Sequence, residues 1–131
     1  MQLGYVILYV PDVAQAMAFY EDAFGLSVRF VDDSGTYGEM ATGATKLAFA
    51  SEELAASHGF DFEPQSPGRR PAAFEIAFVT QDVQAGFAKA IGNGARALTE
   101  PKLMSWGQWV SYVADLNGYT VEICSPTGAE E

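Results

Sequence analysis

Apolar residues run almost without interruption over residues 3–10, and the apolar positions that follow recur at helical spacing over residues 13–24. A continuous apolar run of this length is typical of a strand covered on both faces, whereas the spacing of three and four predicts an amphipathic helix. Pro11 ends the strand, Asp12 can cap the helix, and Gly25 can end it. The chain is therefore predicted to open with a strand and a helix.

Three further strands are predicted after this helix, at residues 27–31, 37–41 and 45–50, which completes a β-α-β-β-β module. Residues 51–73 differ in composition. Their first half can hold a short helix, and the Pro-Gly-Arg-Arg-Pro stretch that follows predicts an exposed linker.

The same order of elements returns after the linker. An Asp-Val pair at Asp82 repeats the pair at Asp12, 70 residues later, and each begins a helix that ends in glycine. The strand at residues 119–123 repeats the strand at residues 45–49 with an offset of 74. Such a repeat fixes the architecture and places four positions in equivalent pairs: Tyr5 with Glu75, and Ala48 with Glu122.

In the second module the pattern predicts a short strand at residues 96–98, a loop over residues 99–107, and a hairpin of strands at residues 108–113 and 119–124. The dipeptide Asn117-Gly118 predicts a type I′ turn, in which both central residues have positive φ.

These elements predict an α+β fold. We expect one domain over residues 1–131, built from module 1 (3–50), a linker (51–73) and module 2 (74–125). The two βαβββ modules are expected to curl their sheets into an incomplete barrel with the helices outside. Chemistry is then expected on the concave face.

The composition narrows the choice of partners. The chain has 7 basic and 17 acidic residues, a formal charge of −10, so nucleic acid and anionic membranes are unfavourable partners. The N-terminus shows no signal-peptide pattern. The one cysteine, Cys124, is expected to be a buried thiol in a protein of the cytoplasm.

Glu75 and Glu122 are the first candidates for chemistry. If both point into one cavity, their repulsion raises one pKa, and a ligand cation or a shared proton relieves it. They are candidate catalytic residues, because a shared proton can make one of them a general base. The alternative is that one or both pair with an arginine such as Arg29 or Arg96.

Aromatic residues are the second indication. Tyr5 and Tyr9 share a face of the first strand by alternation, and the Trp106 loop is longer than its counterpart in module 1. An aromatic and acidic cavity suits a flat or cationic organic ligand. The alternative is that each tryptophan packs in the core or at a subunit interface. We expect the ligand contacts to be Tyr5, Tyr37, Glu75, Trp106, Trp109 and Glu122.

The chain resembles the vicinal oxygen chelate superfamily, which includes glyoxalases, bleomycin-resistance proteins and dioxygenases. The resemblance rests on V-P-D-V and F-Y-E-D-A-F-G-L in the first module, and on E-I-A-F and W-G-Q-W-V-S-Y-V-A-D-L-N-G-Y-T-V-E-I in the second. It implies metal-ligand positions at Tyr5, Ala48, Glu75 and Glu122. Only Glu75 and Glu122 carry side chains suited to a divalent metal, so no cofactor is expected, and a divalent metal is the less favoured alternative.

The resemblance leads to three functional hypotheses. The first is a homodimeric small-molecule-binding protein like those for bleomycin resistance, which is metal-free and sequesters a cationic or aromatic compound. The second is a glyoxalase-like, metal-dependent lyase or isomerase with an atypical site. The third is a metal-free enzyme that uses Glu75 or Glu122 as acid or base.

Overall fold

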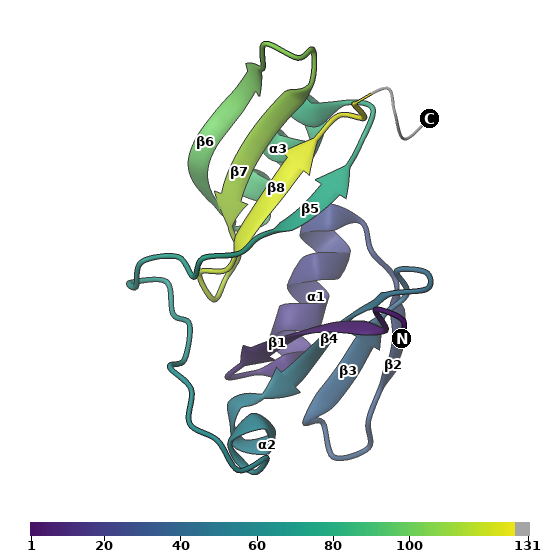
Figure 1. Ribbon diagram of the computed structural model, residues 1–131, viewed down its shortest axis with the longest axis vertical. Helices are drawn as coiled ribbons and strands as arrows, with labels where there is room; N and C mark the ends of the chain where they lie inside the picture. Colours follow the sequence, from purple (N-terminus) through teal and green to yellow (C-terminus); the bar gives the residue numbers. More distant parts are fainter. Residues whose placement is uncertain (128–131) are drawn as a thin grey trace. The chain divides into compact units, whose positions relative to one another are not determined.

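The computed structural model describes residues 1–127. It divides the chain into two compact units. We call Met1–Gln65 the N-terminal unit and the part that begins at Ser66 the C-terminal unit. Figure 1 shows that each unit contains a twisted sheet with a long helix along one face.

The N-terminal unit follows the predicted βαβββ order and ends in a short helix. Its sheet has the strand order β1-β4-β3-β2, with β1 parallel to β4 and the other pairs antiparallel. The elements in chain order are β1 (Tyr5–Val10), α1 (Val13–Phe24), β2 (Val28–Val31), β3 (Tyr37–Met40), β4 (Lys46–Ser51) and α2 (Glu52–Ala56).

The ends of α1 are set by the residues that the sequence indicated. The Asp12 carboxylate accepts a hydrogen bond from the Gln15 backbone N–H at 3.0 Å, and Gly25 takes a left-handed conformation with φ of 70°. The helix packs its apolar face on the sheet, where the ring of Tyr20 lies 5.0 Å from that of Phe49. Both side chains are almost completely buried, so this contact is the centre of the N-terminal core.

The C-terminal unit repeats the arrangement, with the strand order β5-β8-β7-β6 and β5 parallel to β8. Asp82 caps its helix as Asp12 caps α1, with an oxygen 3.0 Å from the Ala85 backbone nitrogen. The elements in chain order are β5 (Ile76–Val79), α3 (Val83–Gly92), β6 (Arg96–Leu103), β7 (Trp109–Ala114) and β8 (Thr120–Cys124).

The α+β class and the two tandem βαβββ modules are confirmed. The strands of residues 1–127 pair into two separate four-stranded sheets and are not closed into a barrel. The predicted equivalences also hold in the strand registers. Ala48 lies opposite Ile7 on β1, and Glu122 lies opposite Ala77 on β5, seventy positions later.

Two details of the second module were predicted wrongly. Strand β6 continues to Leu103, through most of the predicted loop. It is an edge strand whose pairing with β7 is interrupted between Thr99 and Lys102, and this interruption accommodates Pro101 without a backbone N–H.

The second error concerns the β7–β8 turn. No residue other than glycine has a positive φ in the described chain, so Asn117-Gly118 does not form a type I′ turn. Gly118, with φ of 91°, donates its N–H to the Asp115 carbonyl oxygen at 3.1 Å. The Asp115 carboxylate in turn accepts from the backbone N–H groups of Asn117 and Tyr119. Asp115 therefore organises this turn.

Within residues 1–127 no helix is long and apolar enough to cross a lipid bilayer.

Candidate functional site

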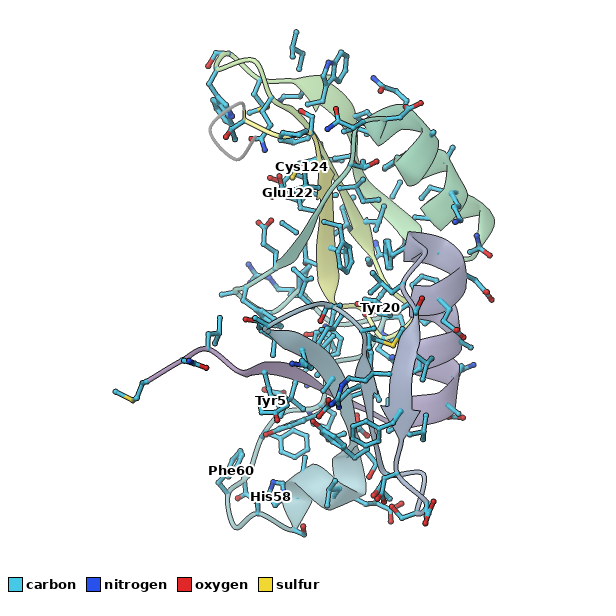
Figure 2. The ribbon with its side chains drawn as sticks, turned by 90° about the vertical axis from the view of Figure 1, so that its right-hand side faces the viewer. Tyr5, Tyr20, His58, Phe60, Glu122 and Cys124 are labelled. Atoms are coloured by element: carbon cyan, nitrogen blue, oxygen red, sulfur yellow. The ribbon has the colours of Figure 1, made fainter. Side chains whose placement is uncertain are left out.

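The open face of the C-terminal sheet, opposite α3, carries the two glutamates. Helix α3 covers the face of Ile123, since a Cβ added to Gly86 would lie 3.2 Å from Ile123 Cγ2. Alternation places Glu122 on the other face of β8, where it lies opposite Tyr112 of β7. Figure 2 shows Glu122 on the side of the strand that points away from α3.

The carboxyl groups of Glu75 and Glu122 form a hydrogen-bonded pair on this face. Burial, the hydrogen bond to Glu75 and the negative charge of Glu75 together raise the pKa of Glu122 to about 7. A hydrogen bond between two carboxyl groups requires that one of them hold a proton. With a pKa of about 7, Glu122 is about half protonated at neutral pH.

Tyr112 and Cys124 complete the surroundings of the pair. Cys124 and Tyr112 favour the charged form of Glu122 and offset part of the rise in its pKa. The Cys124 thiol donates to the Phe78 carbonyl oxygen, 3.6 Å from the sulfur. Burial and the negative charges of Glu122 and Glu75 raise the pKa of Tyr112, so its hydroxyl stays a proton donor. We call Glu75, Glu122 and Tyr112 the carboxyl-pair site.

The alternative pairing with arginine does not occur at this site. Arg29 instead forms an ion pair with Glu39, whose Oε1 lies 2.8 Å from Arg29 Nη1. Within residues 1–127, neither Glu75 nor Glu122 forms an ion pair with a basic side chain.

Two of the predicted aromatic contacts lie together on the face of the N-terminal sheet opposite α1. Tyr5 stands on the side of β1 away from α1 (Figure 2), and Tyr37 is close enough for its pKa to be affected by Tyr5. Ala48 lies on the same face, completely buried between Ile7 and Glu39. Glu39 is thus the carboxylate of this face, at the position equivalent to Tyr112.

Trp109 does not share the face of the C-terminal sheet that carries the carboxyl pair. Trp109 is three residues before Tyr112 in β7, so it projects from the opposite face of the sheet, beside Leu103 of β6. Trp106 lies in the turn between β6 and β7, where its indole N–H donates to Gln108 Oε1 at 2.9 Å. It is 60% exposed.

Tyr112 of the carboxyl-pair site, and Glu39 at the equivalent position of the N-terminal sheet, are not among the ligand contacts predicted from the sequence. The sequence does contain a signal for Tyr112. In an antiparallel hairpin that turns at Asp115–Gly118, Tyr112 is the residue opposite Glu122. Glu39 was harder to find. Its equivalence to Tyr112 depends on a strand register that the sequence alone does not fix.

The residues present do not fit the metal site that the fold family implies. Within the described chain, no three His, Cys, Asp or Glu side chains are grouped closely enough to hold a metal ion. Ala48 has no donor atom, and two carboxylates without an imidazole are a poor donor set for zinc, nickel or iron.

Comparisons with other proteins extend over both units. Residues 2–123 match the Glyoxalase/Bleomycin resistance protein/Dioxygenase superfamily. The chain is 23% identical over 124 residues to the uncharacterized protein YraH of Bacillus subtilis (strain 168), a match that covers 94% of this chain and 97% of YraH.

Two solved structures share the fold. One is a glyoxalase-related enzyme from Fulvimarina pelagi, with a TM-score of 0.82 and 20% identity over 96% of this chain and 88% of that one. The other is a glyoxalase/bleomycin resistance protein/dioxygenase family enzyme from Burkholderia phytofirmans PsJN, with a TM-score of 0.72 and 18% identity over 95% and 98%. The chain belongs to the Glyoxalase/Bleomycin resistance protein/Dioxygenase superfamily.

Proposed function

We propose that this protein binds an organic ammonium compound at the carboxyl-pair site without a metal, and sequesters it as bleomycin-resistance proteins of the superfamily sequester their ligand. The observation that carries the proposal is the hydrogen-bonded pair of Glu75 and Glu122 on an open sheet face, with no basic side chain paired to either glutamate within residues 1–127. Two adjacent carboxyl groups without a cation are a site at which a cation replaces a proton.

The energetics favour this exchange. A unit charge at 4 Å from a carboxylate contributes about 4 kcal/mol at the effective dielectric constant of a protein surface, before the cost of removing both groups from water. An ammonium group between Glu75 and Glu122 also removes the repulsion that raises the pKa of Glu122. The ring of Tyr112, opposite Glu122 on the same face, adds apolar surface for the carbon skeleton of the ligand.

Amine binding is expected to release protons. With a Glu122 pKa of about 7, a ligand that requires the charged pair displaces about 0.9 proton at pH 6, 0.5 at pH 7 and 0.1 at pH 8. Because the proton competes with the cation, affinity increases about ten-fold from pH 6 to pH 8. Calorimetric titration with benzylamine, in two buffers of different ionisation enthalpy at each pH, measures the number of protons released.

Binding without proton release at pH 6, or affinity that is constant from pH 6 to pH 8, contradicts the proposed exchange. Benzylamine stays protonated over this range, so a change in its own charge does not imitate the effect. Cyclohexylmethanol, a neutral molecule of similar size, is the control ligand and is expected to show no proton release.

We infer a second candidate function, a metal-free enzyme in which Glu122 transfers a proton. The observation in its favour is that a pKa of about 7 leaves the group half protonated at neutral pH, which is the condition for efficient general acid–base catalysis. The rate of substrate turnover would have to depend on the protonation state of Glu122. Turnover that survives replacement of both glutamates by glutamine removes this candidate.

A further inference from the structure

The N-terminal unit contains a buried carboxylate that the carboxyl-pair site does not use. Glu39 is 5% exposed, and each of its oxygens has a partner. Oε1 accepts from Arg29 Nη1 and Oε2 accepts from the Tyr37 hydroxyl, both at 2.8 Å. A carboxylate held from both sides fixes the groups that hold it, so Arg29 and Tyr37 are locked in place on this face.

The guanidinium of Arg29 is only partly used by this contact. Its side chain is 51% exposed, and within residues 1–127 it makes one hydrogen bond, through Nη1. A guanidinium carries five N–H donors in a planar fork, so most of them remain available to a bound group. The register of β2 with β3 is irregular between Val28 and Phe30, and Arg29 is the residue at this bulge. Such a bulge changes the direction of a side chain, often beside a functional site.

The ring of Phe30 lies beside the Arg29 guanidinium, and the ring of Tyr37 lies beside Phe30. The guanidinium carbon lies 5.5 Å from the centre of the Phe30 ring, which in turn lies 6.1 Å from the Tyr37 ring. Tyr5, on the same face, is 55% exposed. Burial and the neighbouring Glu39 raise the pKa of Tyr37 to about 12, so this phenol stays neutral and does not repel an anion.

We propose that Arg29 is a second ligand-binding residue, which binds the carboxylate of an aromatic acid through its unused N–H donors while the ring of the acid packs against Tyr5 and Phe30. Glu39 and Tyr37 are positioning residues that hold the guanidinium. The ligand class is opposite in charge to that of the carboxyl-pair site, and the residues involved are different, so each proposal can fail without the other.

Titration with benzoate followed by amide chemical shifts tests this site. In the chain of residues 1–131 we expect saturable shifts at residues 28–31 and 37–40, and Arg29→Gln is expected to weaken benzoate binding at least ten-fold. Arg29→Lys keeps the positive charge but removes the planar pair of N–H donors that can bind a carboxylate in bidentate fashion. It is therefore expected to give an intermediate affinity. Arg96→Gln removes an exposed arginine of the C-terminal unit and is expected to bind benzoate like the unmodified protein.

Absence of saturable shifts, or saturable shifts elsewhere in the chain, overturns the proposal, and neither result depends on whether a variant folds. Equal benzoate affinity in the unmodified protein and folded Arg29→Gln also overturns it. Benzylamine is the second probe for the Arg29 variants. Its affinity is expected to be unchanged, whereas an equal loss for both probes would show a general structural effect and contradict a specific role.

Discussion

Replacing Glu122 with glutamine is expected to weaken benzylamine binding about 10- to 100-fold at pH 8. The substitution keeps the size of the side chain but removes the charge that faces the ammonium. A hydrogen bond to a charged group contributes roughly 1.5–3 kcal/mol, and each 1.4 kcal/mol corresponds to about ten-fold in affinity. At pH 6 the difference between the two proteins is expected to be smaller, because most of the unmodified protein then carries the proton on Glu122.

The matched control is Glu100→Gln, which removes the charge of an exposed glutamate on β6 of the same sheet. It changes the net charge of the chain by the same amount, so a general electrostatic effect would lower the affinity equally in both variants. Equal affinities of Glu122→Gln and the unmodified protein at pH 8 would show that the carboxyl pair does not bind the amine.

Replacing Phe49 with alanine is expected to lower the free energy of unfolding of the N-terminal unit by about 3–5 kcal/mol. Phe49 has no exposed surface, and its ring contacts Tyr20 of α1 at 5.0 Å between centroids. The substitution leaves a cavity between β4 and α1 that neighbouring side chains fill only in part. Urea denaturation, followed through the tyrosine signal, measures the change.

Phe60→Ala is the control for this substitution, since Phe60 is 52% exposed and its loss is expected to change the unfolding free energy by less than about 0.5 kcal/mol. A loss below about 1 kcal/mol for Phe49→Ala would contradict the packing of α1 on this sheet.

The sequence was sufficient to predict the fold because the signals were local and were repeated. Asp12 and Asp82 each cap a helix, and the following apolar positions face a sheet in both units. The boundaries of β6 were not predictable from the same signals. Pro101 normally argues against a strand, and only the interrupted pairing of an edge strand accommodates it.

The candidate site was predictable only in part. The repeat made Glu75 equivalent to Tyr5 and Glu122 equivalent to Ala48. In the structure the carboxyl groups of Glu75 and Glu122 interact with each other. Trp109 could not be assigned to a face, because a shift of one residue in the start of β7 reverses inside and outside. The Arg29–Glu39 ion pair could not be predicted from the sequence either, because it depends on the irregular register between β2 and β3.

The central claim is that Glu75 and Glu122 share a proton near neutral pH, and carbon-13 NMR titration of the glutamate side-chain carboxyls measures this directly. The account predicts that the Glu122 carboxyl titrates with a midpoint of about 7 and that Glu75→Gln lowers this midpoint. A Glu122 midpoint at the ordinary value, between about 4 and 5, would contradict the shared proton and the cation site built on it.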